Sequence, residues 1–455
     1  MNKIHNLKVG VSGVRGIVGD TFTPSLVAAF AASYGEYVGG GRVIVGRDTR
    51  PSGPMIEHAV IAGLVSVGCQ PILAGIIPTP TIQIAVDEYH ANGAIAITAS
   101  HNTAEWNALK FINSSGIFFN ETEAAELLDV YNQPDNLFVK EQDYRSVRAI
   151  DDAFELHQKR IFRNINVEAI RKARFKIAVD CCNGVGALYA RPFLEELGCE
   201  VISIFDEADG NFRRRPEPVP QNLSELCRVV RENGCAAGFA QDPDGDRIAL
   251  IKGNGKAAGE QYSIVLAAEH VLSKTPGNVV VNIQTTKAVE DVAAKYGCKV
   301  FYSTVGEINV TRQMLAVNSI IGGEGSSGGV IWPAVHPCRD SFAAMALFLE
   351  MMALRSESID TILDKLPQYH SKTLKFPCSA FKSQQIIRHL RAKYAQHNPV
   401  TIDGIRINFD DAWILVRSSN TEPLMRLTTE ARSISKAEKL AADFSKEISA
   451  LLTEK

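Results

Sequence analysis

Phe175-Lys-Ile-Ala-Val-Asp180 opens the stretch of sequence that determines the fold. This short run predicts a strand. A glycine-containing loop, Asn183-Gly-Val-Gly186, follows it and leads to a helical stretch that ends at Gly198-Cys199, before a second strand, Glu200-Val-Ile-Ser-Ile204. A glycine at this place suits the left-handed end of a helix. The order strand, helix, strand favours two parallel strands joined by a right-handed crossover.

The same pattern occurs twice more in the chain. One copy runs from Arg42-Val-Ile-Val-Gly46 to a helix that ends at Gly68-Cys69. Another runs from Asn278-Val-Val-Val-Asn282 to a helix that ends at Gly297-Cys298. One shared Gly-Cys pair would mean little, but three pairs in matching contexts indicate an internal repeat of three similar α/β units.

The C-terminal part of the chain has a different pattern. It predicts a strand at 372–376, a helix at 383–395, a hairpin within 404–417 and a final helix at about 435–452. This mixture favours a smaller α+β domain. We therefore expect an α/β protein, with three similar α/β domains that contain mixed sheets and a C-terminal α+β domain. The expected domains are residues 1–150, 151–255, 256–370 and 371–455.

Composition and charge exclude several classes of protein. With 45% hydrophobic and 22% charged residues, the 455-residue chain is typical of a soluble globular protein. A net charge of −3 disfavours nucleic-acid binding, so local basic residues must hold any anionic ligand. The sequence lacks an apolar run of about 18 residues, and its first residues lack the apolar core of a signal peptide. Nine scattered cysteines without a C-x-x-C pair indicate reduced thiols and a cytoplasmic location.

Ser100 follows the apolar run Gly93-Ala-Ile-Ala-Ile-Thr98, which predicts a buried strand. A serine at the end of such a strand can present its hydroxyl to a cleft, and His101 places an imidazole beside it. That arrangement suits an oxygen that accepts and hands on a phosphoryl group. The alternative is a strand-to-helix turn in which Ser100 only caps the next helix.

Three aspartates alternate along Gln241-Asp-Pro-Asp-Gly-Asp-Arg247, after another apolar run. Carboxylates at i, i+2 and i+4 on a loop bent by Gly and Pro can converge on one hard cation, so Asp242, Asp244 and Asp246 predict a magnesium site. An EF-hand is disfavoured because the later bidentate glutamate is missing. Arg247 would offset the negative charge and orient a carboxylate or phosphate. The alternative is a solvated acidic turn.

Two further loops offer groups for a polar ligand. In Gly322-Gly-Glu-Gly-Ser-Ser-Gly-Gly329 the glycines permit close approach, and the glutamate and serines suit sugar hydroxyls. In Arg417-Ser-Ser-Asn-Thr-Glu-Pro423, with Arg426 shortly after, hydroxyls, an amide and arginine suit a phosphate. Taken alone, the first loop is equally compatible with a flexible linker, and the second is more simply a polar hairpin turn.

These four segments, in this order, resemble the α-D-phosphohexomutase superfamily, the group of phosphoglucomutases, phosphomannomutases and phosphoglucosamine mutases. The resemblance covers essentially the whole chain and extends to residues 11–16, 45–50 and 77–80. It implies four domains around a central cleft, three of them alike.

The resemblance also implies a catalytic centre. Phosphorylated Ser100 would give its phosphoryl group to a sugar 1-phosphate or 6-phosphate and take back the other phosphate of the resulting bisphosphate. Lys110 and Arg15 would add positive charge, with solvated basic residues as the alternative. His101 would orient a group or transfer a proton, with a structural hydrogen bond as the alternative. One Mg²⁺ ion would bind to Ser100, Asp242, Asp244 and Asp246.

The remaining implied residues bind the substrate, a small sugar phosphate. They are Glu324, Ser326, Ser327, Arg247, Arg417, Ser419, Asn420, Thr421 and Arg426. A hexose 1,6-bisphosphate would serve as activator. Neither nucleic acid nor a membrane is an expected partner, and the protein is expected to be a monomer or a homodimer.

The chain departs from the family pattern at three places. Thr103 and Ser418 stand where the family usually has proline, and a glycine at 328 or 329 replaces a histidine that many members have in the sugar loop. We expect a phosphoglucosamine mutase, with a phosphomannomutase or phosphoglucomutase as the alternative. A metal-dependent phosphatase and a non-catalytic sugar-phosphate sensor are two other classes that these residues leave open.

Overall fold

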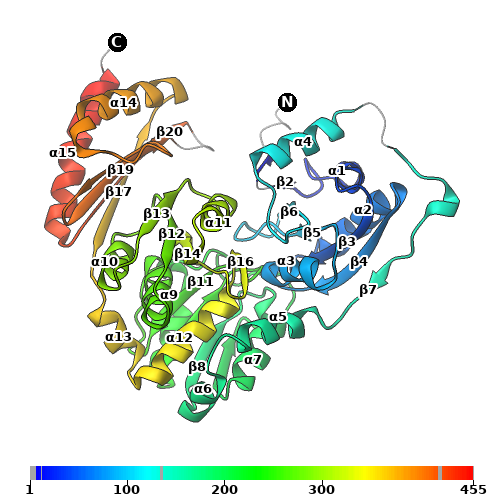
Figure 1. Ribbon diagram of the computed structural model, residues 1–455, viewed down its shortest axis with the longest axis horizontal. Coiled ribbons are helices and arrows are strands. Elements are labelled where there is room, and N and C mark those ends of the chain that lie inside the picture. Colours follow the sequence, from blue (N-terminus) through cyan, green and yellow to red (C-terminus); the bar gives the residue numbers. More distant parts are fainter. Residues whose placement is uncertain (1–6, 12, 134–136, 419–422, 454–455) are drawn as a thin grey trace.

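Figure 1 shows the computed structural model, which describes residues 7–11, 13–133, 137–418 and 423–453. The chain forms four β-sheets with helices packed against them. The first sheet lies on the right of Figure 1, the second and third in the lower centre, and the fourth at the upper left.

The first sheet is mixed and has seven strands. They are β1 (Lys8–Gly10), β2 (Gly13–Ile17), β3 (Gly41–Arg47), β4 (Cys69–Ile76), β5 (Gly93–Ile97), β6 (Trp106–Ile112) and β7 (Arg148–Ala149). Their order in the sheet is β1-β2-β6-β5-β3-β4-β7. The helices of this unit are α1 (Pro24–Tyr37), α2 (Gly53–Ser66), α3 (Thr79–Glu88) and α4 (Glu121–Tyr131).

The second sheet contains β8 (Lys176–Asp180), β9 (Glu200–Ile204), β10 (Ala237–Gln241) and β11 (Ile248–Lys252), in the order β11-β10-β8-β9. Its helices are α5 (Ala153–Phe162), α6 (Val167–Ala173), α7 (Gly186–Glu196) and α8 (Ser224–Glu232).

The third sheet contains β12 (Asn278–Asn282), β13 (Val300–Ser303), β14 (Ser319–Glu324), β15 (Gly329–Trp332) and β16 (His336–Arg339), in the order β13-β12-β14-β15-β16. Its helices are α9 (Gln261–Lys274), α10 (Ala288–Lys295), α11 (Glu307–Ala316), α12 (Ser341–Arg355) and α13 (Ile359–Lys365). Short 3-10 turns along the chain lie at Glu141–Asp143, Pro220–Asn222, Gly325–Ser327 and Ala395–His397.

One arrangement of four strands recurs in these three sheets. A central strand (β3, β8 or β12) pairs in parallel with the next strand (β4, β9 or β13) and with a third strand (β5, β10 or β14). The third strand then pairs antiparallel with a fourth (β6, β11 or β15). The predicted internal repeat is therefore confirmed, and the sheets are mixed as expected.

The turn from the third to the fourth strand is the place where the predicted functional segments lie. It carries Ser100 in the first unit and the three aspartates in the second, and in the third it follows directly on Glu324. Equivalent connections of three repeated units therefore supply three of the four predicted segments.

The three repeated glycines end their helices as the sequence predicts. Gly68, Gly198 and Gly297 follow α2, α7 and α10 with φ angles of 79°, 79° and 66°. These angles lie in the left-handed region that glycine adopts without steric cost, so the chain can turn from each helix into the next strand.

The fourth sheet is antiparallel and has the order β17-β20-β19-β18. Its strands are β17 (His370–Pro377), β18 (Ile405–Phe409), β19 (Ala412–Ser418) and β20 (Leu424–Ala431), and its helices are α14 (Ala380–Lys393) and α15 (Ile434–Thr453). The predicted hairpin and final helix are both present.

The two faces of the fourth sheet have different neighbours. On one face, Ile414 and Val416 share a hydrophobic cluster with residues of α14 and α15. On the other face, Trp413 and Leu415 pack with Ile283, just after β12. This alternation along β19 docks the C-terminal domain against the third unit.

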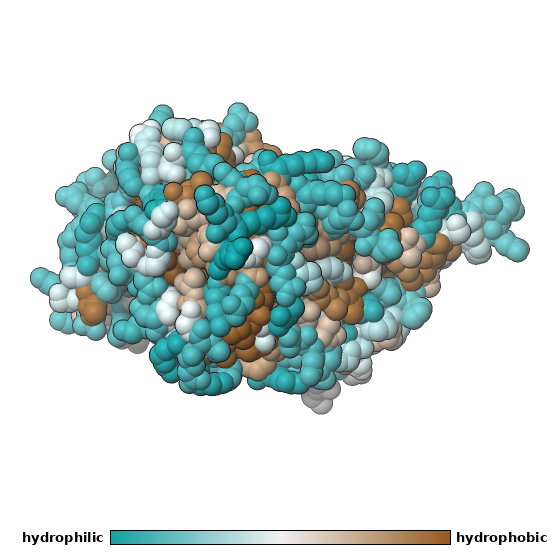
Figure 2. Space-filling model, turned by 90° about the horizontal axis from the view of Figure 1, so that it is seen from below, coloured by the Kyte–Doolittle hydropathy of each residue, from teal (hydrophilic) through white to brown (hydrophobic). Residues whose placement is uncertain are grey.

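The first three units share one hydrophobic core. The largest cluster of buried apolar side chains runs from Ile44 of the first sheet through Phe193 of α7 to Phe342 of α12. Within the described ranges, no helix combines the length and the apolar character that a bilayer-spanning segment needs. Hydrophilic residues cover most of the face seen in Figure 2, with hydrophobic residues in separate patches between them.

A buried chain of polar side chains also joins these three units. Thr81 Oγ1 on α3 lies 2.8 Å from His157 Nδ1 on α5, and His157 Nε2 lies 2.8 Å from Asp340 Oδ2, at the start of α12. All three residues are buried. Because each buried polar atom has a partner, the contact between the units carries no penalty for unpaired groups.

His336, at the start of β16, contributes a pH-dependent contact between the third and first units. Its Nε2 lies 2.9 Å from the carbonyl oxygen of Gly116. Burial, only partly opposed by this hydrogen bond, lowers the pKa of His336 to about 4, below the value of about 6.5 of an unfolded chain. The stability that His336 contributes is therefore complete above pH 6.5 and is lost as the pH falls from 6.5 towards 4.

We expect His336→Gln to remove this part of the pH dependence of stability. In urea unfolding between pH 8 and pH 4, the wild type should lose up to about 3 kcal/mol more than the variant across that window. The exposed His58 on α2 offers a control, since His58→Gln should retain the wild-type slope. A wild-type slope in His336→Gln as well would contradict this assignment.

Candidate active site

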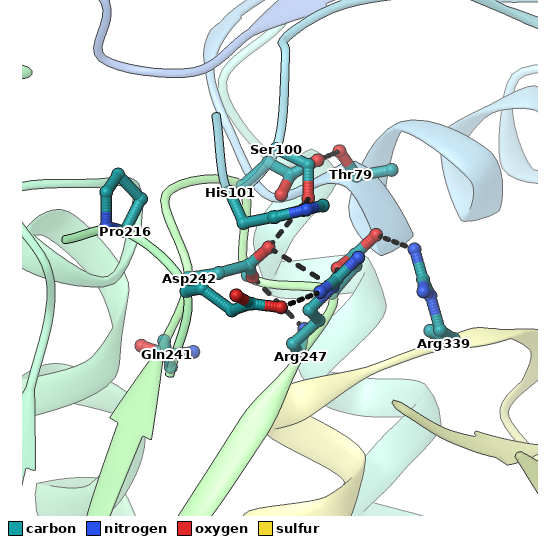
Figure 3. A network of polar contacts seen from close by, with 12 residues as sticks. Thr79, Ser100, His101, Pro216, Gln241, Asp242, Arg247 and Arg339 are labelled. Carbon is teal, nitrogen blue, oxygen red and sulfur yellow. Dashed lines mark hydrogen bonds and ion pairs between the residues drawn. The ribbon is translucent and has the colours of Figure 1, made fainter. Parts of the chain in front are cut away.

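Ser100 lies in the loop of residues 98–105, here called the serine loop. Its Oγ donates a hydrogen bond of 2.9 Å to Asp242 Oδ2 of the second unit, and only 4% of the residue is exposed. Figure 3 shows Ser100 and Asp242 directed at each other. The φ angle of Ser100 is 49°, a left-handed conformation that costs energy in any residue but glycine. The chain continues into β6 rather than into a helix, so the alternative in which Ser100 caps a helix is wrong.

Arg50 holds the backbone of the serine loop in this conformation. Its completely buried guanidinium donates to the carbonyl oxygens of Ser100 (2.6 Å), Asn102 (2.8 Å) and Thr103 (2.7 Å). Asp48 accepts a further bond of 2.9 Å from Arg50 Nε. No role was predicted for Arg50 from the sequence, although Asp48-x-Arg50 directly after a buried strand is a signal that could have identified it.

The three aspartates of the turn between β10 and β11, here called the metal loop, converge in the interior. One carboxylate oxygen from each of Asp242, Asp244 and Asp246 lies within 4.8 Å of the other two, and each residue is at most 1% exposed. Asp244 Oδ1 and Asp246 Oδ1 have no hydrogen-bond partner among the described residues. Burial excludes a solvated acidic turn. Convergent carboxylate oxygens are the ligands that Mg²⁺ prefers, and two of them lack a hydrogen-bond partner among the described residues, so the three residues fit this ion.

The charges of the three aspartates are unequally compensated. Burial, with the negative charges of Asp246 and Asp244, raises the pKa of Asp242 well above its usual range. Burial also opposes ionisation of Asp244, but the charge of Lys110, together with hydrogen bonds to Asp242, Lys110 and Thr79, lowers the pKa of Asp244. Lys110 Nζ lies 2.7 Å from Asp244 Oδ2, and Thr79 Oγ1 donates to the same oxygen at 2.9 Å. A bound cation would stabilise the ionised form of all three carboxylates.

His101 and Arg15 lie beside Ser100. Burial, with the positive charges of Arg247 and Arg15, lowers the pKa of His101 to about 2. The imidazole is therefore neutral near pH 7, and its Nδ1 lies 3.4 Å from Ser100 Oγ. Such a ring is a poor proton acceptor, which favours an orienting role. Arg15 donates to Asn102 Oδ1 at 2.8 Å and so contacts the serine loop directly.

Arg247 lies against the metal loop (Figure 3). Its Nε is 3.9 Å from Asp242 Oδ2 and 3.7 Å from Asp246 Oδ1, and its backbone N–H donates to Asp242 Oδ1 at 3.1 Å. These contacts make Arg247 a counter-charge for the metal loop.

Glu324 is buried at the start of the segment 324–329, here called the sugar loop. Its Oε1 accepts hydrogen bonds from Asn282 Nδ2 (3.0 Å) and from the N–H of Gly306 (2.7 Å). Its Oε2 accepts one from Arg339 (3.0 Å). Glu324 is thus fixed in place by groups of the third unit. One of these groups is Arg339, which was not predicted from the sequence as a site residue.

The tip of the sugar loop has no room for a side chain at residue 328. Gly328 has a φ of 67°, and a Cβ atom there would lie 2.3 Å from the carbonyl oxygen of Ile248. This close contact with β11 explains in physical terms why a glycine stands here. Ser326 Oγ donates to Gln284 Oε1 at 3.3 Å, whereas the side chain of Ser327 lies outside the described part of the chain.

Cationic side chains cross the fourth sheet in a row. Arg417 on β19 is directly opposite Arg426 on β20, and Arg426 is directly opposite Lys375 on β17. Arg417 pairs with Asp403 of the same domain at 3.3 Å. Like charges in opposite positions destabilise a sheet, so a bound anion would stabilise this row. The predicted residues Ser419, Asn420 and Thr421 lie outside the described residues.

The fold and the matches of family models define a phosphohexomutase. The models describe phosphoglucomutase/phosphomannomutase alpha/beta/alpha domains I, II and III, which match residues 6–137, 155–255 and 259–369, and its C-terminal domain, which matches residues 379–447. The chain belongs to this family, within the α-D-phosphohexomutase superfamily, as the resemblance implied.

Individual relatives are similar over almost their whole length. A probable phosphoglucosamine mutase of Methanopyrus kandleri is 34% identical, over 96% of both chains. A phosphoglucomutase/phosphomannomutase of Thermococcus kodakarensis is 36% identical, over 94% of this chain and 95% of the relative. A crystal structure of a phosphoglucomutase/phosphomannomutase family protein from Burkholderia thailandensis covers 99% of this chain and 98% of its own, with 26% identity and a TM-score of 0.87.

We expect Arg50→Lys to impair the serine loop more than the overall fold. A lysine cannot reach three carbonyl oxygens and Asp48 together, so the loss of stability should be roughly 2–4 kcal/mol. The resemblance implies that glucose 1,6-bisphosphate phosphorylates Ser100. The rate of this reaction, measured by intact-protein mass spectrometry, should fall at least about 10-fold in the variant, because a reacting group is misplaced.

Arg47→Lys is the matched control for this variant. Arg47 pairs with Glu57 at 3.4 Å instead of with the serine loop. Equal phosphorylation rates in Arg50→Lys and Arg47→Lys would show that Arg50 does not position Ser100.

Proposed function

We propose that this phosphohexomutase interconverts glucosamine 1-phosphate and glucosamine 6-phosphate, with phosphoserine 100 and a bisphosphorylated sugar as intermediates. The choice of sugar rests on the carboxylates that lie around the sugar loop. Glu324 and Glu307 share one guanidinium, that of Arg339, which also pairs with Asp246. An amino sugar carries a positive charge that this excess of carboxylates favours. The name of the M. kandleri relative supports the same choice.

The serine loop and the metal loop carry the side chains that would transfer the phosphoryl group. In the reaction the bond between Ser100 Oγ and phosphorus breaks, a bond from a sugar hydroxyl oxygen to phosphorus forms, and the hydroxyl proton passes in balance to Ser100 Oγ. Ser100 Oγ lies 2.9 Å from Asp242, so a phosphoryl group on it would lie at the aspartates. Lys110 and Arg247 bring positive charge to the same place. A magnesium ion held by Ser100 and the three aspartates would neutralise charge on the transferring group.

The cationic row of the fourth sheet would hold the phosphate that does not react. Arg417 and Arg426, with Ser419, Asn420 and Thr421, would anchor either end of the sugar while the other end faces Ser100. A hexose 1,6-bisphosphate would restore phosphoserine 100 when the intermediate escapes. We further propose a cytoplasmic protein, monomeric or homodimeric, whose partners are small sugar phosphates.

The name of another relative supports a different sugar preference. The T. kodakarensis relative is named phosphoglucomutase/phosphomannomutase, so glucose or mannose phosphates form the alternative substrate class.

Turnover of the three hexose 1-phosphates tests the proposal. With Mg²⁺ and a trace of the matching bisphosphate, we expect a higher kcat/KM for glucosamine 1-phosphate than for glucose or mannose 1-phosphate. A difference of about 10-fold corresponds to about 1.4 kcal/mol, the size of one favourable ionic contact. A higher value for glucose or mannose establishes the alternative, and steady phosphate release without a 6-phosphate establishes a phosphatase.

Ser100→Ala should abolish transfer while leaving the fold intact. We expect kcat to fall at least about 1,000-fold, because the atom that accepts the phosphoryl group is missing. The exposed Ser114, in the turn after β6, serves as control, and Ser114→Ala should retain wild-type turnover. Full activity in Ser100→Ala, with an unchanged circular dichroism spectrum, would refute the assignment.

A further inference from the structure

Arg339, the last residue of β16, binds three carboxylates that come from three different segments. Its Nε donates to Glu307 Oε2 at 3.0 Å and its Nη1 to Glu324 Oε2 at 3.0 Å. Its Nη2 donates to Asp246 Oδ2 at 2.5 Å. Figure 3 shows the Arg339 side chain reaching towards the metal loop. One guanidinium thus joins the start of α11, the sugar loop and the metal loop.

The charge at this place is incompletely compensated. Burial raises the pKa of Glu307 to about 7, and the pull of Arg339 in the opposite direction does not restore its usual value. Arg339 is shared by three buried carboxylates, of which Asp246 also has Lys110 Nζ at 3.8 Å and Arg247 Nε at 3.7 Å. A change of charge on one of the three therefore changes how strongly Arg339 binds the other two.

Further hydrogen bonds near Arg339 involve the metal loop and the sugar loop. Ser341 Oγ, two residues on, donates to the carbonyl oxygen of Gly245 at 2.6 Å. The N–H of Ile248, just after the metal loop, donates to the carbonyl oxygen of Gly328 in the sugar loop at 3.0 Å. The contacts of Arg339 are therefore supported by a direct hydrogen bond between the sugar loop and the residue that follows the metal loop.

We propose that Arg339 is a positioning residue that couples sugar recognition at Glu324 to metal binding at Asp246. Asp246 Oδ2 accepts the hydrogen bond from Arg339, whereas Oδ1 has no hydrogen-bond partner among the described residues and lies 3.7 Å from Arg247 Nε, so Oδ1 is the oxygen that can accept a metal ion. A sugar hydroxyl or ammonium group that approaches Glu324 competes with Arg339 for the Glu324 carboxylate. This competition alters the strength of the hydrogen bond between Arg339 and Asp246. By linkage, the metal alters sugar affinity by the same factor. This inference rests on the proposed function, because it requires a sugar at Glu324.

Binding of Mn²⁺, followed by the electron paramagnetic resonance signal of the free ion, tests the coupling without turnover. Full-length wild type, Arg339→Lys and the control Arg355→Lys are titrated alone, with inorganic phosphate, and with glucosamine 1-phosphate. Arg355 lies at the end of α12 and pairs with Glu269, away from the site. Inorganic phosphate measures the direct attraction between an anion and the metal.

We expect glucosamine 1-phosphate to change the Mn²⁺ Kd of the wild type about 5-fold or more beyond the effect of inorganic phosphate, a usual size for coupled sites. The same factor should appear in Arg355→Lys and should fall to within about 2-fold of unity in Arg339→Lys, since a lysine cannot bridge three carboxylates. An undiminished factor in Arg339→Lys overturns the inference.

Glu324→Gln provides a second test if Arg339→Lys does not fold. It should reduce the coupling as much as Arg339→Lys does. The double variant should lose no more of the coupling than either single variant, because both substitutions act on the same interaction. Additive losses overturn the inference. If glucosamine 1-phosphate, glucose 1-phosphate and mannose 1-phosphate all fail to bind the wild type by calorimetry, the proposed function itself fails. If one of them binds but leaves the Mn²⁺ Kd at the inorganic-phosphate value, only the coupling fails.

Discussion

The burial of three aspartates within one turn is the constraint on which the rest of the structure depends. An ionised carboxylate taken out of water costs several kcal/mol unless other groups compensate it. Here the compensation comes from distant parts of the chain. Lys110 belongs to β6 and Arg339 to β16, whereas Arg247 directly follows Asp246 in the chain. The first, second and third units must therefore pack together to compensate the cost of burying the ionised carboxylates of the metal loop.

The repeat explains how these parts meet. In each of the first three units, the polar segment lies in or at the turn between the third and fourth strand of the same topology. Duplicated units packed on one core, and joined by the Thr81–His157–Asp340 chain, direct their equivalent turns to one place. The site is thus a consequence of the symmetry of the fold and not of any single unit.

Local signals in the sequence predicted much of this arrangement. The Gly-Cys repeats and the alternating aspartates report conformations set within a few residues, such as the left-handed glycine after α2. The sequence Asp48-x-Arg50 marks Arg50 as a residue of interest, but the contact of Arg50 with Ser100 and that of Arg339 with Asp246 could not be predicted in the same way. Ser100 lies 50 residues from Arg50, and Asp246 lies 93 residues from Arg339. An arginine at the end of a strand has the same local sequence whether it faces water or a buried carboxylate.

The position of the cationic row of the fourth sheet also depends on contacts with the third unit. Arg406 of the fourth sheet lies between the rings of Tyr302 (4.5 Å) and Trp413 (4.3 Å) and donates to the carbonyl oxygens of Ile283 (2.8 Å) and Thr285 (3.1 Å).

Thr285 Oγ1 in turn accepts a hydrogen bond of 3.1 Å from the N–H of Gly325 in the sugar loop. The segment after β12 therefore binds the C-terminal domain on one side and the sugar loop on the other. The distance between the cationic row and the sugar loop is set by this segment of the third unit, because both are anchored to it.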